Sequence, residues 1–283
     1  MTSSRPVVCV DLDRTLIYSP NALMLDVPDA VAPRLLCVEM YRGAPWSFMT
    51  EGAAAALVRI AQAAVLVPTT TRTPQQLARV HLPGPPAPFA IASNGGHLLV
   101  DGIEDVDWSA QVRRRVAGCA PVDEVHTHLQ DVGPAFGNGG FVHNLRVASE
   151  LFVYAVVERA DVPQGWLQEL TEWCRVRGWT TSMQGRKVYC VPVTLTKSAA
   201  AREVLRRTGA GHWLAAGDSL LDGEMLAAAD EAVRPAHGEL HDAGFAAPDL
   251  HVTDARGVLA GEELTRWLLA QVVSPALVAG GLP

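Results

Sequence analysis

A short apolar run, Val7–Val10, ends abruptly in two aspartates and constrains the fold more than any other segment. The run is too short for a buried helix and is rich in valine, so it predicts a fully buried strand of a parallel sheet. Asp11 and Asp13 would lie at the carboxyl end of this strand, where open α/β sheets bind ligands. Two carboxylates this close repel each other unless a cation or a shared proton intervenes. The stretch therefore fits a Mg²⁺ or phosphoryl-transfer site, and taken alone it fits an Asp-rich turn equally well.

Two later apolar runs, 64–67 and Trp213–Ala216, also predict buried strands that end in polar residues. The chemically useful side chains at these ends, together with one at a predicted helix start, are Thr70, Lys197, Asp218 and Asp222. Taken singly, the threonine reads as a helix cap and the lysine as a solvated helix face. Their joint occurrence with the first two aspartates favours a site for phosphate chemistry at one edge of the sheet.

The pattern changes between residues 97 and 191, which predicts an inserted domain. Helices are expected over 108–117 and 163–177, and antiparallel strands over 122–129, 141–147 and 151–157, with a closing hairpin over 179–191. His126 and His128 would alternate on one of these strands without companion ligands, which disfavours a zinc site. We therefore expect a core of 1–96 with 192–283, and a small α+β domain of 97–191.

Composition limits the classes of function. Of 283 residues 49% are hydrophobic and 19% are charged, which is typical of a globular chain. The formal net charge of -7 disfavours a nucleic-acid partner, and no apolar run is long enough to span a membrane. The five scattered cysteines form no CxxC pair, and the first strand leaves no room for a signal peptide, so a cytoplasmic protein is expected. The oligomeric state stays open.

These motifs resemble those of the haloacid dehalogenase (HAD) superfamily of phosphatases. Asp11-Leu12-Asp13-Arg14-Thr15 resembles the first motif, DxDxT, and Gly217 to Asp222 resembles the fourth, GDxxxD. Thr70 and Lys197 match the second and third, and Asn94-Gly95 resembles a strand-ending Asn-Gly of one branch. The resemblance covers nearly the whole chain and implies an α/β, Rossmann-like HAD core with a mostly parallel sheet. The insert resembles a C2-type cap, similar to Cof-type and sucrose-phosphate or trehalose-phosphate phosphatases.

The resemblance also implies roles for individual residues. Asp11 would be the nucleophile and Asp13 the general acid and base, with Thr70 and Lys197 holding the phosphoryl group. Mg²⁺ would bind Asp11, the backbone carbonyl of Asp13 and Asp218, and Asp222 would ligate it through water or orient Asp218. The candidates for substrate binding are Arg72, Asn94, Arg186 and Lys187.

Arg14 and Thr71 depart from the family pattern, because each replaces a common glycine. Arg14 could touch the substrate or point away from the ligand into a salt bridge, and we favour the second.

The predicted function is Mg²⁺-dependent hydrolysis of a small phosphorylated metabolite, a sugar phosphate in the first instance, through an aspartyl-phosphate. Two alternatives stay open at this stage. A phosphomutase would use the same first steps and return the phosphoryl group to a sugar. A catalytically silent regulatory or binding protein would keep the fold alone, although it would have no chemical reason to keep a cluster of repelling carboxylates.

Overall fold

The structure is a computed structural model that describes residues 5–132 and 140–273. The chain divides into two compact units, one of Met1–Asp105 with Lys197–Pro283 and one of Val106–Thr196, here called the core unit and the inserted unit. The predicted boundaries at residues 97 and 191 differ from this division. The inserted unit begins at Val106 and not at residue 97. The reason is that β6 (His97–Val100) and β7 (Ile103–Glu104) pair in one sheet with β5 (Phe89–Ala92), which belongs to the core unit.

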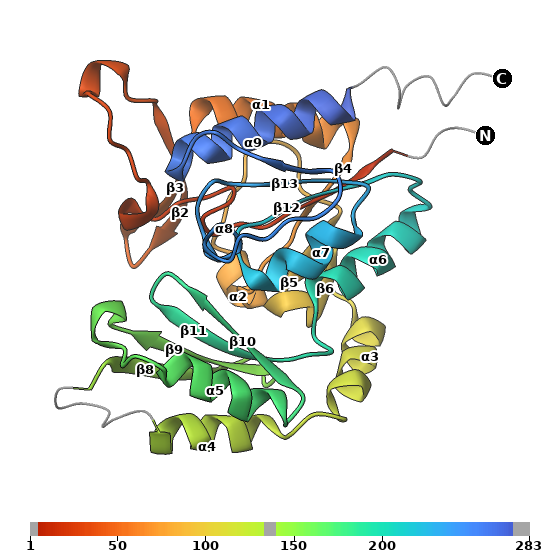
Figure 1. The fold of residues 1–283 in the computed structure, drawn as a ribbon. Helices are drawn as coiled ribbons and strands as arrows, with labels where there is room; N and C mark the ends of the chain where they lie inside the picture. Colours follow the sequence, from red (N-terminus) through yellow and green to blue (C-terminus); the bar gives the residue numbers. More distant parts are fainter. Residues whose placement is uncertain (1–4, 133–139, 274–283) are drawn as a thin grey trace. The chain divides into compact units, whose positions relative to one another are not determined.

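Parallel strands form the centre of the core unit (Figure 1). In the described residues this sheet has five strands in the order β14-β13-β12-β1-β4, which span Leu250–Val252, Glu231–Arg234, Trp213–Ala216, Val7–Val10 and Val65–Pro68. Every neighbouring pair is parallel, as the valine-rich runs predicted. Val10 aligns with Pro68 on one side and with Ala216 on the other. The residues that follow these three strands therefore emerge together at one edge of the sheet.

Helices cover both faces of this sheet (Figure 1). α1 (Glu51–Ala63) and α9 (Gly257–Val272) bury their apolar residues on one face, in a core cluster with Val8, Val10 and Leu214. Thr50 caps α1, because its side chain accepts a hydrogen bond from the N–H of Ala53 at 3.0 Å. α6 (Lys197–Thr208) and α7 (Gly223–Ala228) lie on the other face, and the short α8 spans Glu239–Asp242.

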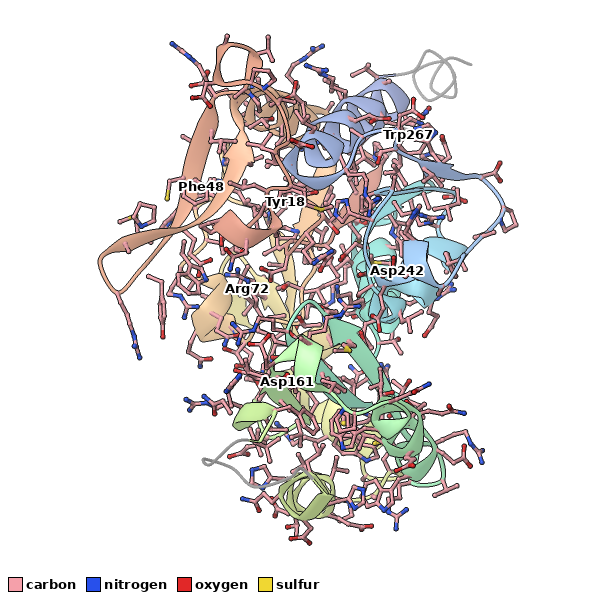
Figure 2. All side chains as sticks on the ribbon, turned by 60° about the vertical axis from the view of Figure 1, so that its left-hand side comes forward. Tyr18, Phe48, Arg72, Asp161, Asp242 and Trp267 are labelled. Atoms are coloured by element: carbon pink, nitrogen blue, oxygen red, sulfur yellow. The ribbon has the colours of Figure 1, made fainter. Side chains whose placement is uncertain are left out.

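A β-hairpin joins β1 to α1. Its strands, β2 (Leu35–Tyr41) and β3 (Ala44–Thr50), pair antiparallel. Tyr18 and Phe48, both labelled in Figure 2, exchange two backbone hydrogen bonds of 2.8 Å. These bonds tie the hairpin to the segment that follows Asp13. The short α2 (Pro74–Leu77) begins with a capping box between Thr73 and Gln76.

The inserted unit has the predicted α+β character. Its helices are α3 (Val106–Val116), α4 (Val122–Val132) and α5 (Trp166–Arg175), and its strands are β8 (Val142–Ala148), β9 (Phe152–Val157), β10 (Trp179–Gln184) and β11 (Lys187–Pro192). Four of the described strands form an antiparallel sheet in the order β10-β11-β9-β8. No helix within residues 5–132 or 140–273 is long and apolar enough to span a membrane.

One predicted strand of this unit is wrong, because residues 122–129 belong to helix α4. The alternation of His126, Thr127 and His128 suggested a strand, but the buried positions are Val125 and Leu129, four residues apart. That spacing places both side chains on one face of a helix. His126 and His128 therefore lie on a helix, and His128 stacks on Trp173 of α5 with ring centroids 3.6 Å apart.

Candidate active site

The parallel sheet brings the predicted strand-end residues together in the core unit. The N–H of Asp11 donates to the carbonyl of Ala216 at 2.9 Å, and the N–H of Thr69 donates to the carbonyl of Val10 at 2.8 Å. These bonds continue the ladders of β1, β4 and β12 by one residue beyond the strands. The side chains that follow them thus start from adjacent points at the carboxyl edge of the sheet.

Lys197 links two of the aspartates. Its Nζ lies 2.6 Å from Oδ1 of Asp11 and 2.6 Å from Oδ1 of Asp222, and only 1% of its side chain is exposed. Burial alone would lower the pKa of Lys197, but the two carboxylates outweigh it and raise that pKa. The lysine is therefore a fixed cation at the first turn of α6, aimed at Asp11.

The carboxylates of Asp11, Asp218 and Asp222 form a buried group. One oxygen from each carboxylate lies within 4.8 Å of the chosen oxygens of the other two. Burial raises the pKa of Asp11 to about 7 despite the neighbouring Lys197. Burial, followed by repulsion from Asp11 and Asp222, raises the pKa of Asp218 well above its usual range. A divalent cation would offset both effects, and hard carboxylate oxygens are the ligands that Mg²⁺ prefers. The chemistry of these residues therefore fits a Mg²⁺ site.

Two glycines make room for these carboxylates. A Cβ on Gly217 would lie 2.4 Å from Cβ and Cγ of Asp222, so the predicted GDxxxD pattern requires glycine at this position. A Cβ on Gly238, where φ is +90°, would lie 2.5 Å from Oδ2 of Asp218. The sequence analysis did not single out Gly238, because it lies 20 residues from Asp218 in a loop with no motif of its own.

Asp222 is fixed from two sides. Its Oδ1 contacts Lys197, and its Oδ2 accepts hydrogen bonds from the backbone N–H and the hydroxyl of Ser219 at 3.0 and 2.7 Å. The aspartate thus closes the turn of Leu220–Asp222 that precedes α7. This arrangement suits a residue that orients Lys197 and the other carboxylates.

Arg14 forms a salt bridge, as expected, but toward the site. Its Nε lies 3.3 Å from Oδ2 of Asp218, and 30% of its side chain is exposed. The expectation that it points away is wrong, since the guanidinium pairs with a residue of the candidate site. The backbone of Arg14 has a left-handed φ of 65°, which is uncommon for arginine. The same φ gives a physical reason for the glycine that the resemblance places at this position.

Arg72 holds Asp13 through two parallel hydrogen bonds. Its Nε and Nη2 donate to Oδ2 and Oδ1 of Asp13 at 2.7 and 2.8 Å, and its Nη1 donates to Glu39 at 2.8 Å. Burial would lower the pKa of Arg72, but these two carboxylates outweigh it and raise that pKa. The carboxylate of Asp13 is 41% exposed, in contrast to the buried Asp11. The two aspartates of the first motif therefore have different surroundings, as acid and nucleophile roles require.

Thr70 and Asn94 lie on adjoining backbone segments. The N–H of Asn94 donates to the carbonyl of Thr70 at 2.9 Å, and the hydroxyl of Thr70 accepts from the N–H of Arg72 at 3.1 Å. Both residues are almost fully buried, and Asn94 has a left-handed φ of 57°. The roles of Thr70 in catalysis, and of Asn94 and Arg72 in substrate binding, stay predictions.

Arg186 and Lys187 belong to the inserted unit, at the turn between β10 and β11. Arg186 lies 3.1 Å from Glu158, and the Nζ of Lys187 lies 5.6 Å from the ring centre of Tyr154. Their contribution to substrate binding stays a prediction.

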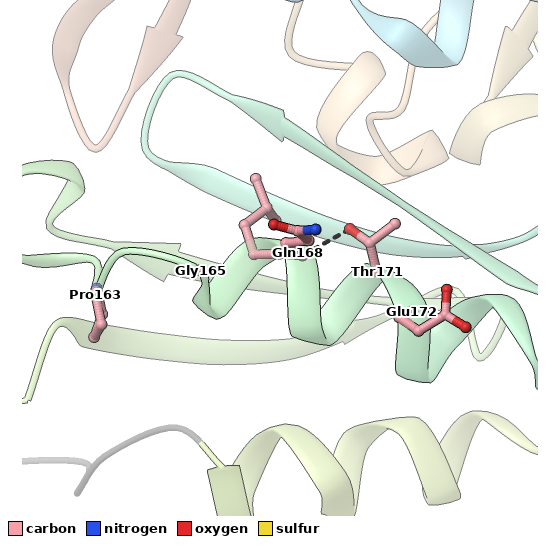
Figure 3. Close-up of a pocket in the computed structure, with 6 residues that line it drawn as sticks. Pro163, Gly165, Gln168, Thr171 and Glu172 are labelled. Atoms are coloured by element: carbon pink, nitrogen blue, oxygen red, sulfur yellow. Dashed lines mark hydrogen bonds between the residues drawn. The ribbon is translucent and has the colours of Figure 1, made fainter.

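An open hollow of about 760 Å³ also lies in the inserted unit, beside α5 (Figure 3). Thr171 donates to the carbonyl of Leu167 there at 2.7 Å, and Glu172 pairs with Arg175. The one carboxylate of this lining, that of Glu172, is already paired with Arg175, so the hollow suggests no catalytic chemistry.

His237 is hydrogen-bonded to the backbone of the loop that contains Arg14. Its Nε2 lies 2.8 Å from the carbonyl oxygen of Arg14 and must donate, while its Nδ1 accepts from the N–H of Gly257 at 3.1 Å. The neutral ring satisfies both bonds, and a second proton would break the one to Gly257. Burial lowers the pKa of His237 from 6.5 to about 4.

We expect this histidine to make the protein sensitive to acid. The unfolded chain binds a proton at His237 below 6.5 and the folded chain only below about 4, so its stabilising contribution is full above 6.5 and declines as the pH falls. The advantage of wild type over His237→Gln in free energy of unfolding should shrink by about 2 kcal/mol from pH 7 to about pH 5. Urea unfolding of both proteins at the two pH values measures this. An unchanged difference would contradict a neutral, bonded His237.

Solved structures share this fold, whereas no protein-family model and no curated protein matches the sequence. The sucrose-phosphatase of Synechocystis sp. PCC6803, solved with sucrose and phosphate, aligns with a TM-score of 0.61 at 12% identity, over 94% of this chain and 98% of that chain. The trehalose-6-phosphate phosphatase C-terminal domain of C. albicans aligns with a TM-score of 0.54 at 12% identity, over 95% and 93%. A HAD subclass IIB sugar phosphatase aligns with a TM-score of 0.50 at 12% identity, over 98% of this chain and 99% of that chain. The predicted HAD resemblance is confirmed at the level of the fold.

Proposed function

We propose that this chain is a Mg²⁺-dependent phosphatase that hydrolyses a small phosphomonoester through an aspartyl-phosphate on Asp11. The observation that carries the proposal is the position of Lys197, whose Nζ contacts both Asp11 and Asp222 at 2.6 Å inside a buried group of three carboxylates. A purely structural core has no need of so many buried charges, because each is costly to desolvate. Phosphoryl transfer needs this combination of a nucleophile, cations and metal ligands.

In the first half-reaction a carboxylate oxygen of Asp11 forms a bond to phosphorus while the bond to the leaving oxygen breaks. Asp13, which is partly exposed, donates its proton to that leaving oxygen and so releases the alcohol. In the second half-reaction Asp13 takes a proton from a water molecule, whose oxygen bonds to phosphorus while the bond from phosphorus to Asp11 breaks, so that phosphate is released and Asp11 is regenerated. Lys197 and Thr70 hold the phosphoryl oxygens, and the charge of Lys197 also favours the ionised form of Asp11.

Asp11, Asp218 and the backbone carbonyl of Asp13 would hold Mg²⁺, and Asp222 would ligate it through water or orient Asp218. Bound there, the cation would neutralise charge on the phosphoryl oxygens. Arg14 would remain beside Asp218 and add a second, fixed positive charge.

The favoured substrate is a sugar phosphate in the cytoplasm. Support comes from the fold shared with a sucrose-phosphatase and a trehalose-6-phosphate phosphatase domain, which is an argument by analogy. The inserted unit would act as the cap that selects the organic part, with Arg186 and Lys187 as candidates for anion binding. The five cysteines are free thiols, which is consistent with a reducing compartment.

Phosphate release from a panel of sugar phosphates and nucleotides, with Mg²⁺ and with EDTA, tests the proposal. We expect at least one sugar phosphate to be hydrolysed with Mg²⁺, and the rate to fall by about a hundredfold or more when EDTA removes the metal. Activity that survives EDTA would sink the mechanism. Return of the phosphoryl group to a second sugar position, without free phosphate, would identify a mutase instead.

A further inference from the structure

Glu39 is a fully buried carboxylate on a largely exposed hairpin. Its side chain is 0% exposed, whereas Met40 and Trp46 of the same hairpin are 51% and 47% exposed. An ionised carboxylate is costly to bury unless charged partners and hydrogen bonds compensate it. The inside position of Glu39 therefore calls for a reason beyond the packing of the hairpin.

The carboxylate of Glu39 has three donors. Its Oε2 accepts from Nη1 of Arg72 at 2.8 Å and from the hydroxyl of Ser47 at 2.6 Å, and its Oε1 accepts from Nε of Arg79 at 3.2 Å. Two arginines balance the charges of Glu39 and Asp13. The network therefore runs without a break from strand β2 to the carboxylate of Asp13.

Glu39 lies at an irregularity in the pairing of the hairpin. The register of β2 with β3 shifts on both sides of this residue, between Cys37 and Glu39 and again between Glu39 and Met40. Glu39 also forms a bridge with Val80, in the segment after α2. Such irregularities re-aim a side chain out of the regular alternation, and here Val38 and Glu39 are consecutive buried residues of β2.

The planar guanidinium of Arg72 transmits the position of Glu39. Its Nη1 donates a hydrogen bond to Glu39, and its Nε and Nη2 donate to the two carboxylate oxygens of Asp13. Because the guanidinium is rigid and flat, anchoring one nitrogen fixes the plane of the edge that faces Asp13. Without Glu39, Arg72 is free to rotate about its side-chain bonds, and the carboxylate of Asp13, which is bonded to it, changes its orientation as well.

We propose that Glu39 is a positioning residue for the reaction, which acts through Arg72 to hold the side chain of Asp13 where its protonated form donates to the leaving oxygen. The inference rests on the proposed phosphatase function and adds a residue that no motif contains. If Glu39 has this role, the β2–β3 hairpin contributes a residue that the reaction depends on.

The test uses two substrates that differ in their need for an acid. A sugar alkoxide must be protonated as it leaves, whereas p-nitrophenolate leaves without a proton. kcat/KM reports formation of the phosphoenzyme, the step in which Asp13 acts as acid. We expect Glu39→Gln to lower kcat/KM about tenfold for the best sugar phosphate and less than about twofold for p-nitrophenyl phosphate.

Two further variants separate positioning from packing. Ser47→Ala removes another hydrogen bond to the same carboxylate and leaves the pair of Glu39 with Arg72 intact, so it should change both substrates equally. Asp13→Asn should show the same discrimination between substrates as Glu39→Gln, and the double variant should lose no more than Asp13→Asn alone, because the two residues act on one step. If Glu39→Gln does not fold, Glu39→Asp carries the same test, since it keeps the charge but shortens the reach to Arg72.

Equal losses on both substrates in Glu39→Gln, or additive losses in the double variant, would overturn the inference while leaving the phosphatase function standing. A wild-type protein that releases phosphate from neither substrate would overturn the proposed function and this inference with it.

Discussion

Replacing Asp11 with asparagine is expected to lower kcat by about a thousandfold or more and to leave the fold intact. The change removes the proposed nucleophile and keeps the size of the side chain. Because burial already disfavours the charged form of Asp11, a neutral amide relieves its repulsion with Asp218 and Asp222. Lys197 retains Asp222 as its partner. The free energy of unfolding without Mg²⁺ should therefore be equal to that of wild type or higher by about 1 kcal/mol.

The matched control is Asp242→Asn, since Asp242 is an exposed aspartate on α8 of the same unit (Figure 2). Its kcat should stay within about twofold of wild type, as is usual for surface changes. Steady-state kinetics and urea unfolding of both variants give the comparison. Near-normal turnover by Asp11→Asn would mean that water attacks phosphorus directly or that the reaction occurs elsewhere.

Lys197→Met is expected to cause the largest loss of stability of any single change at the site. The lysine is 1% exposed and contacts two buried carboxylates, so its removal leaves Asp11 and Asp222 without their common cation. Breaking a buried ion pair in this way costs about 3–5 kcal/mol. Activity should fall as well, because the phosphoryl group loses a fixed positive charge.

Mg²⁺ should recover part of this stability, because a bound dication neutralises the same carboxylates. The gain in free energy of unfolding on adding saturating Mg²⁺ should be larger for Lys197→Met than for wild type. The exposed Arg206 of the same helix supplies the control, and Arg206→Met should behave as wild type within about 0.5 kcal/mol. If Lys197→Met were as stable as wild type without Mg²⁺, the ion pairs would not hold the carboxylates in place.

The sheet and most of the candidate site were predictable because they depend on local signals. A valine-rich strand, a following carboxylate and the parallel order of strands suffice to bring Asp11, Asp218 and Thr70 to one edge. Gly217 could likewise be read from its motif, since Asp222 packs against it. These features need no knowledge of distant contacts beyond the order of the strands.

The remaining features depend on contacts that no local pattern encodes. In the sequence, Glu39 is one polar residue of an expected strand. Its buried position goes with the irregular pairing of β2 and β3 and with the hydrogen bond from Arg72, which the local pattern does not reveal. Arg14 pairs with Asp218 and has a left-handed φ that is uncommon for arginine, and neither feature follows from the local sequence pattern. In α4, polar residues that alternate over a short stretch imitated a strand, and the helical spacing of Val125 and Leu129 became decisive only once their burial was known.

The central claim is that the phosphoryl group passes through Asp11, and a burst experiment on Asp13→Asn tests it most directly. With p-nitrophenyl phosphate the first step needs no acid, whereas the second still needs the base that the variant lacks. We predict a rapid burst of about one nitrophenolate per enzyme, followed by slow turnover, and a phosphoryl group on the peptide that contains Asp11 after quenching in acid. A linear time course with no burst and no phosphoryl group on that peptide would contradict the account.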